Sequence, residues 1–250
     1  PALCTSIRKL SKKGEISIFT RTYYRPSELS SNYYEACFTP LIYPGQTITA
    51  RVYVPDDAPA DLYAALYVYD DHHKAIHQAE ATHLIPGAWQ DLSYAIPMLS
   101  DCLLSEVGIV LRNLGESWTV GSFYIGELDW HGVPNYACTF RYERSESNSI
   151  SQWTRLRGYW RLEDGAYHGS GTDESETYSG DIQWDDYGLT AEIVPLIGEH
   201  HYVNCRVQGA LRSYAFGLAP DQQIALYKKD ESYTQVATSE FKWRHGETYQ

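Results

Sequence analysis

Long helical patterns are almost absent from this 250-residue sequence, and no complete catalytic motif is present. There is no G-x-S-x-G nucleophile turn, no glycine-rich phosphate loop and no Cys–His arrangement, so the corresponding enzyme classes lack their reactive groups. None of the given residues has the pattern of a signal peptide, and no apolar run among them is long enough to cross a bilayer. The architecture is therefore easier to derive from this sequence than an activity.

Basic residues are scarce as well. The chain has 20 Lys and Arg against 32 Asp and Glu, which gives a formal net charge of -12. A surface of this sign repels phosphate groups, so the sequence predicts neither nucleic acid nor an anionic membrane as a partner.

The cysteines are too few and too scattered to form a framework. They are five in number, contain no C-x-x-C pair, and are Cys4, Cys37, Cys102, Cys138 and Cys205. This pattern fits neither a disulfide scaffold nor a zinc site. We therefore expect a reducing, cytoplasmic location.

What the sequence does contain is regular alternation of apolar and polar residues. Residues 48–54 alternate in this way, and the same period of two recurs over residues 189–193 and 203–207. Such a period places side chains on alternate faces of a strand. Short strands separated by turn signals are typical of β-sandwiches, and the 22 Tyr and 7 Trp suit strands or sugar-binding surfaces. The sequence predicts an all-β protein of two tandem antiparallel β-sandwiches.

The first residues break this pattern. Leu3, Ile7 and Leu10 recur at helical spacing and are followed by Lys13 and Gly14, which is typical of the end of a helix. We interpret residues 1–14 as a short helical remnant of an upstream domain.

Composition divides the rest of the chain into three parts. A stretch rich in Ser, Glu and Asn, residues 143–151, is typical of a linker. It separates a first sandwich, residues 15–142, from a second sandwich, residues 152–250, which we expect to be truncated.

Short segments carry a family resemblance. The segments GQTITARVYVP, GAWQDLSYAIP and GSFYIGELDWHG resemble galactose-binding-like jelly rolls of the carbohydrate-binding kind, while WTRLRGYWRLEDGAYHGSG and RSYAFGLAP resemble concanavalin A-like, laminin-G-type sandwiches. In this order the two are similar to the C-terminal accessory region of bacterial ADP-ribosylglycohydrolase family proteins. The resemblance implies an accessory role beside an upstream, metal-dependent, all-helical catalytic domain, none of whose acidic metal motifs occurs here.

Glu127 and Asp129 lie at the end of an expected strand. In an E-x-D-x-x-E glucanase motif the second Glu would fall on Gly132, so the pair of carboxylates that retaining hydrolysis needs is incomplete. Carbohydrate-binding jelly rolls place such acidic residues beside calcium, which takes about six to eight oxygens. Glu127 and Asp129, with Glu35, are therefore candidate ligands of a structural calcium, and a solvated strand end is the alternative.

Tryptophans are candidates for a sugar platform. Trp118 falls in an expected loop beside Arg112 and Asn113, whose guanidinium and amide donors suit sugar hydroxyls. Trp130 is a second candidate, and Trp89 lies on a face that the sequence does not assign. A packed loop anchor is the alternative for Trp118.

In the second sandwich, Arg206 and Gln208 are expected to point away from the apolar face of a strand. Planar donors on a wet sheet surface suit sugar hydroxyls or a carboxylate. A cross-strand polar pair is the alternative.

Two pairs of adjacent histidines, His72-His73 and His200-His201, resemble metal ligands at first sight. Neighbouring strand residues point to opposite faces, so a pair at i and i+1 rarely shares one ion. We interpret both pairs as exposed turn residues, with metal binding as the alternative.

These features together predict non-catalytic, carbohydrate-binding-type accessory modules that either bring a glycan or glycosylated target to an attached hydrolase or brace that hydrolase structurally. Two alternatives stay open: a fragment of an ADP-ribosylglycohydrolase-like enzyme whose catalytic domain lies upstream, and a protein-interaction or oligomerisation module. No catalytic residue is assigned, and structural calcium is the cofactor expected.

Overall fold

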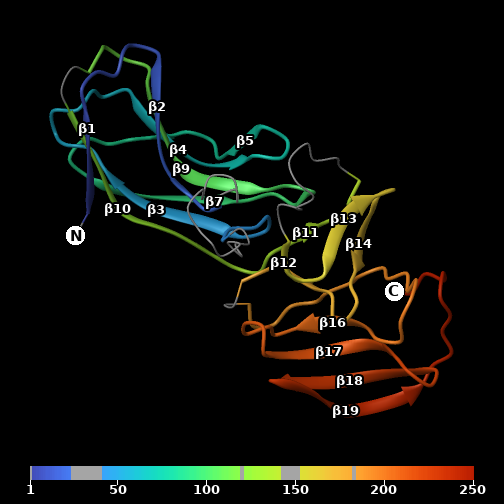
Figure 1. The fold of residues 1–250 in the computed structure, drawn as a ribbon. Helices are drawn as coiled ribbons and strands as arrows, with labels where there is room; N and C mark the ends of the chain where they lie inside the picture. The colour runs from blue at the N-terminus through green and yellow to red at the C-terminus, as the bar shows by residue number, and fades with distance from the viewer. Residues whose placement is uncertain (1, 24–40, 119–120, 142–152, 182–183) are drawn as a thin grey trace. The chain divides into compact units, whose positions relative to one another are not determined.

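The computed structural model describes residues 2–23, 41–118, 121–141, 153–181 and 184–250 (Figure 1). The regular elements in these ranges are all β-strands, so the predicted all-β class is confirmed. No helix in the described ranges has the length and apolarity to span a membrane. The chain divides into two compact units, Pro1–Gly180 and Asp181–Gln250.

Two sheets make up the larger part of the first unit. The β3 sheet consists of β1 (Leu3–Ile7), β10 (Gly121–His131), β3 (Thr47–Tyr53) and β7 (Trp89–Ala95), in that spatial order. The β9 sheet consists of β2 (Gly14–Arg21), β9 (Leu104–Asn113), β4 (Leu62–Asp70) and β5 (Ala75–Gln78), with β6 (Thr82–His83) paired to β4. Neighbouring strands in both sheets run antiparallel.

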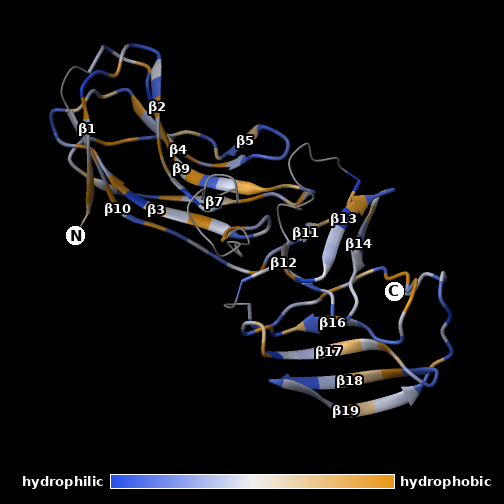
Figure 2. Ribbon diagram, viewed as in Figure 1, coloured by the Kyte–Doolittle hydropathy of each residue, from blue (hydrophilic) through white to orange (hydrophobic). Residues whose placement is uncertain are grey.

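One apolar core lies between these two sheets. Ile48, Val52 and Phe123 from the β3 sheet and Leu66 and Ile109 from the β9 sheet are almost fully buried and belong to the same cluster. β3 alternates between buried and more exposed residues, whereas β9 is buried over most of its length. Figure 2 shows hydrophobic segments in both strands. Each such aliphatic side chain contributes about 1.5–3 kcal/mol when fully buried. The core therefore joins the alternating strand β3 to β4 and β9, which are buried over most of their length.

The helix expected over residues 1–14 is wrong. Leu3–Ile7 is a strand that pairs with β10, and Leu10 forms a β-bridge with Trp118. A spacing of four residues is even, so Leu3 and Ile7 share a face in a strand as they would in a helix. Pairing with β10, which the local sequence pattern does not reveal, makes this segment a strand and not a helix.

Shorter strands complete the first unit. β8 (Leu99–Ser100) and β11 (Tyr136–Ala137) pair in parallel, while β12 (Thr154–Arg157) pairs with β15 (Glu176–Tyr178) and β13 (Tyr159–Glu163) with β14 (Ala166–Ser170). The Tyr43 hydroxyl accepts a hydrogen bond from the Gly180 backbone N–H at 3.1 Å. Residues 153–180 therefore belong with the first unit by their contacts. The predicted linker, residues 143–151, lies outside the described residues, and the predicted domain limits stay predictions.

The second unit contains one antiparallel meander. Its strands are β16 (His201–Cys205), β17 (Arg212–Ala219), β18 (Gln223–Asp230) and β19 (Ser232–Glu240). Trp243 is buried and donates from Nε1 to the Ala219 carbonyl at 2.9 Å. The concanavalin A-like character of this part stays a prediction.

Candidate functional site

Three aromatic rings line up on the outer face of the β3 sheet. Tyr53 on β3 lies opposite Trp89 on β7 and Tyr124 on β10. The ring centroids of Tyr53 and Trp89 are 5.3 Å apart, and those of Tyr53 and Tyr124 are 5.7 Å apart. Trp89 is 43% exposed although it belongs to a regular strand. The row is therefore an aromatic surface open to solvent.

Gly126 on β10 makes room for the indole of Trp89. A Cβ at this glycine would lie 2.9 Å from Cζ3 of Trp89, closer than real Cβ atoms come. Because β3 lies between β7 and β10, the indole crosses β3 to reach Gly126. A register shift between Ile125 and Glu127 places the glycine at this point. The bulge and the missing side chain together let the ring extend across the sheet.

A charged row runs beside the aromatic one. Arg51 on β3 lies opposite Asp91 on β7 and Glu127 on β10. The guanidinium carbon of Arg51 is 5.8 Å from the centre of the Trp89 ring, and its Nε is 3.7 Å from Oδ1 of Asp91. The Arg51 and Asp91 side chains are 58% and 84% exposed. An ion pair this exposed contributes about 0–1 kcal/mol to stability, so Arg51 is available to a ligand.

The two rows border a hollow in the sheet surface. Its first part has a volume of about 250 Å³ and is lined by Thr49, Ala50, Arg51, Asp91, Leu92, Ser93 and Glu127. A second part of about 410 Å³ shares Arg51 and Glu127 with the first and adds Trp89 and Gly126. Hydroxyls, a guanidinium, carboxylates and an indole therefore converge at one place. Such a set can bind a polyhydroxylated ligand through its donors, acceptors and apolar faces.

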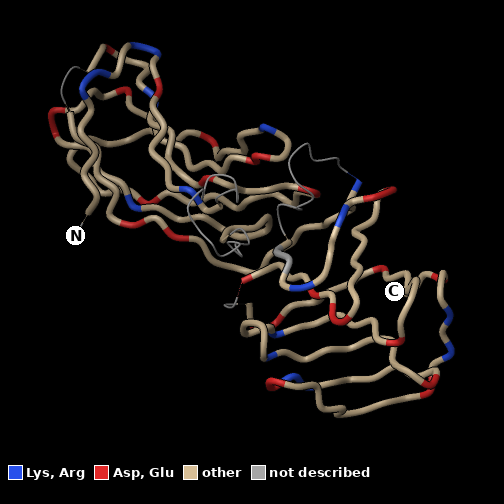
Figure 3. The backbone as a smooth tube through the Cα atoms, viewed as in Figure 1, with Lys and Arg blue, Asp and Glu red and all other residues tan. Residues whose placement is uncertain are grey.

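Lys and Arg residues do not form a continuous stripe on the described backbone of either unit, where acidic and basic segments are interspersed (Figure 3). This distribution agrees with the net charge of -12, which already disfavoured polyanionic partners.

The expectation of an exposed Trp118 ring is wrong. Trp118 is 5% exposed and belongs to the core of the first sandwich. Its backbone N–H and carbonyl both bond to Leu10, at 2.9 and 2.8 Å. The packed loop anchor, which was the alternative, is what the structure shows. Large aromatic side chains near a core gain more from burial than from exposure.

Asn113 and Arg112 do not accompany Trp118 at a binding surface. Asn113 is fully buried, and its Nδ2 donates to the carbonyls of Leu10 and Glu116. Arg112 lies on the β9 sheet and donates to carboxylate Oε2 of Glu15 at 3.1 Å and to Oε1 of Gln78 at 3.0 Å. Adjacent residues of one strand point to opposite faces, which separates this pair.

Trp130 is partly buried against the same core, and its Nε1 donates to the Leu41 carbonyl at 2.9 Å. It lies one residue from Asp129 and so faces the opposite side of β10. The tryptophan in the aromatic row is therefore Trp89, whose face the sequence did not assign.

The calcium expected at Glu127 and Asp129 stays a prediction. Glu127 lines the hollow, and Oδ1 of Asp129 accepts a hydrogen bond from the Trp130 backbone N–H at 2.8 Å. Glu35 lies outside the described residues. Within the described ranges, no three His, Cys, Asp or Glu side chains gather in a way that could hold a metal ion.

Arg206 and Gln208 do not continue the strand that their alternation suggested. β16 ends at Cys205, and Arg206 has a φ of 49°, which is turn geometry. The Arg206 guanidinium lies 3.1 Å from Asp186, and the Gln208 backbone N–H donates to the Arg212 carbonyl. The expected placement on a wet sheet face is therefore wrong, and a sugar-binding role for these residues stays a prediction.

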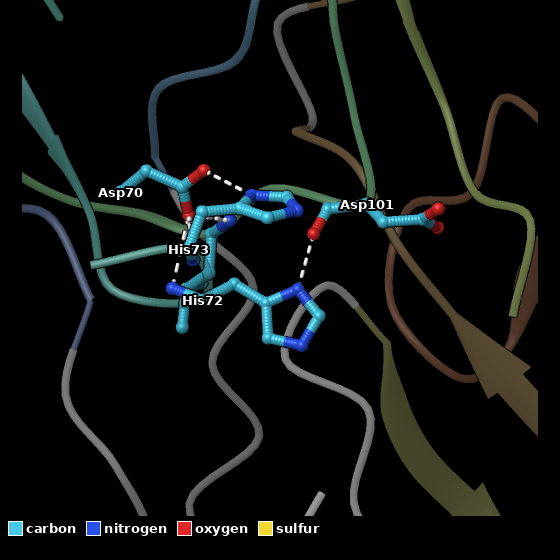
Figure 4. Close-up of polar contacts among 5 residues, drawn as sticks. Asp70, His72, His73 and Asp101 are labelled. Atoms are coloured by element: carbon cyan, nitrogen blue, oxygen red, sulfur yellow. Dashed lines mark hydrogen bonds and ion pairs between the residues drawn. The ribbon is translucent and has the colours of Figure 1, made fainter. Parts of the chain in front are cut away.

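His72 and His73 form part of the turn between β4 and β5, as predicted (Figure 4). The buried carboxylate of Asp70 accepts hydrogen bonds from the backbone N–H groups of His72 and Leu103, at 2.9 and 3.0 Å. Nδ1 of His73 lies 2.6 Å from Oδ2 of Asp70, and Nδ1 of His72 contacts the Asp101 carbonyl. Asp70 thus organises the turn.

In the second pair, His201 is partly buried beside Trp243 and His245, and burial lowers the pKa of its imidazole. Its Nε2 contacts the Gly198 carbonyl. This placement differs from the exposed turn that the sequence suggested, because His201 is the first residue of β16.

No protein-family model matches the sequence. A comparison with curated proteins finds no match either. Among solved structures, the chain is similar to one from a study of the promiscuous specificity of carbohydrate-binding modules of the β-sandwich superfamily, with 12% identity and a TM-score of 0.29. The match covers 52% of this chain and 57% of that one, so the chain spans little more than half the length of that structure. A likeness of this size carries no argument about function.

Sequence reasoning missed the combination of Arg51 and Trp89. The alternation of residues 48–54 does place Arg51 on the polar face of its strand. That alternation does not reveal that β3 lies between β7 and β10. The strand order brings the residues together.

Proposed function

We propose that the outer face of the β3 sheet binds carbohydrate without chemically changing it. The observation that carries this proposal is the exposed indole of Trp89, which extends across the sheet beside Arg51. A pyranose ring has an apolar C–H face that an aromatic ring can bury. Its hydroxyl groups both donate and accept, so they suit the guanidinium and carboxylates of the neighbouring row.

Binding is a better account of this face than hydrolysis. A glycosidase places two carboxylates on either side of the bond that it breaks. Here Asp91 and Glu127 lie on either side of Arg51, the central residue of the row. The two carboxylates therefore flank a guanidinium, an arrangement that suits hydrogen bonding to sugar hydroxyls.

The sequence resemblance to the accessory region of ADP-ribosylglycohydrolases suggests that a catalytic domain is attached to this sandwich. The face would then hold that hydrolase at a glycan or a glycosylated target. The carbohydrate-binding role itself rests on the Trp89 face and does not depend on which catalytic domain is attached.

The substitution Trp89→Ala tests the proposal. We expect binding to a panel of soluble polysaccharides, measured by affinity electrophoresis and calorimetry, to weaken at least about tenfold, because the stacking surface is lost. The sandwich should stay folded, because Trp89 does not belong to the core cluster between the sheets, and circular dichroism checks this.

Phe19→Ala is the matched control, because Phe19 is an exposed aromatic residue on β2, in the β9 sheet. This variant should bind as the unaltered protein does. Failure of the unaltered protein to bind any polysaccharide, or equal binding by Trp89→Ala, would contradict the proposal.

A further inference from the structure

The charges around Arg51 point to the chemical class of the ligand. Of the described residues that line the two parts of the hollow, Arg51 alone is basic, while Asp91 and Glu127 are acidic. Asp129 lies one row further along β10, opposite Thr49. A guanidinium that would otherwise attract anions is therefore flanked by carboxylates on both neighbouring strands.

We infer that this face selects uncharged glycans, and that Asp91 and Glu127 cause the selection by excluding acidic sugars from Arg51. The inference rests on the proposed function and names its substrate class. A uronate carboxylate bound to Arg51 would lie between two carboxylates of the same sign. Two like charges about 4 Å apart repel by about 1 kcal/mol even with the full screening of water, so each carboxylate weakens uronate binding on the order of fivefold or more.

A neutral sugar meets no such repulsion. Its hydroxyl groups can accept hydrogen bonds from the guanidinium and donate hydrogen bonds to Asp91 or Glu127. One pair of neighbouring hydroxyls can therefore bind the basic and the acidic side chains of the row at the same time. Arg51 reaches Asp91 through Nε at 3.7 Å, and a guanidinium carries five N–H donors, so donors are left for the ligand.

The fold does not depend on these acids. The side chain of Asp91 is 84% exposed, and Glu127 is exposed as well. Exposed ion pairs contribute little to stability, so both carboxylates can be replaced by amides without unfolding the sandwich. The selectivity is therefore open to a gain-of-binding experiment.

The test is the double variant Asp91→Asn/Glu127→Gln, measured against a neutral panel (glucomannan, xyloglucan, galactomannan) and against polygalacturonate. The unaltered protein should bind at least one neutral polysaccharide and bind polygalacturonate at least tenfold more weakly. The double variant should bind polygalacturonate at least tenfold more tightly than the unaltered protein, with neutral binding changed less than about threefold. Adding Arg51→Gln should remove this gain, and added salt should reduce it.

The control variant Glu80→Gln/Asp164→Asn removes the same charge from exposed positions outside the hollow and should gain no uronate binding. Polygalacturonate binding by the unaltered protein at neutral-glycan affinity overturns the inference and leaves carbohydrate binding standing. Neutral binding without a gain in the double variant overturns the role of the two acids. Absence of binding to every polysaccharide overturns the proposed function and this inference with it.

Discussion

At the scale of single residues, the turn after β4 shows how one buried carboxylate organises a loop. Asp70 is 1% exposed, and its oxygens accept from His72, His73 and Leu103. A buried charge is tolerated because donors surround it. Removing the carboxylate would leave buried N–H groups without acceptors.

Asp70→Ala should therefore lower the free energy of unfolding by about 3 kcal/mol. Urea unfolding followed by circular dichroism measures the change. Lys12→Gln, the control, breaks the pair with Glu116, whose two side chains are both exposed, and should change stability by less than about 0.5 kcal/mol. Similar stability for the two variants would show that Asp70 does not organise the turn.

His201 gives the stability of the protein a dependence on pH. Its pKa is lowered from the ordinary value of 6.5, first by burial and then by the nearby His245 and His200, while the Gly198 carbonyl opposes this shift. The unfolded chain therefore takes up a proton at a higher pH than the folded one. Stability from this residue is complete above about pH 6.5 and is lost as the pH falls below that value.

We expect the free energy of unfolding to fall between pH 7.5 and about pH 5.5 and to fall less in His201→Gln. Urea titrations at several pH values measure this slope. His131→Gln, at an exposed position of β10, is the control and should keep the original slope. An unchanged slope in His201→Gln would assign the acid sensitivity to other groups.

At the scale of elements, each unit has a strand in which a glycine lets a group of a neighbouring strand come close to the backbone. Gly126 admits the indole of Trp89, and Gly217 on β17 faces the neighbouring strand so closely that a Cβ would lie 2.1 Å from the His201 carbonyl oxygen. The obstacle at Gly217 is backbone, which cannot move aside as a flexible side chain can. The β16–β17 pair therefore requires glycine at this position.

Gly217→Ala should lower the free energy of unfolding by about 1–3 kcal/mol, because β16 and β17 must separate to admit the methyl group. Denaturant unfolding of the whole chain measures this loss. Gly188→Ala is the control, since a Cβ there would meet nothing within 4 Å. Equal stability of the two variants would mean that the strands adjust without loss.

Two strands show where the local sequence pattern is insufficient to predict secondary structure. The strand over Leu3–Ile7 was mistaken for a helix because an even spacing suits both structures, and β16 stops at Cys205 although the alternation continues to Val207. In both cases the secondary structure is decided by a contact with a residue that is distant in the sequence. For Leu3–Ile7 it is pairing with β10, and for β16 it is the bond from the Arg206 N–H to the Tyr187 hydroxyl.

At the scale of the whole molecule, composition and period were enough to predict the class of fold and the sign of the surface. A period of two can be recognised without knowing the partner strand, because a strand with one packed and one wet face alternates apolar and polar side chains. The all-β class follows from this alone, and so does the polar orientation of Arg51. The net charge of -12 follows from counting.

The candidate binding face depends on tertiary structure instead. Trp89, Arg51 and Glu127 come from three strands, and only the order β10-β3-β7 brings them into one hollow. Trp118 had the more suggestive neighbours in sequence but was drawn into the core, because the sandwich gains more by burying its ring. Register and strand order arise from long-range pairing, which a local pattern cannot encode.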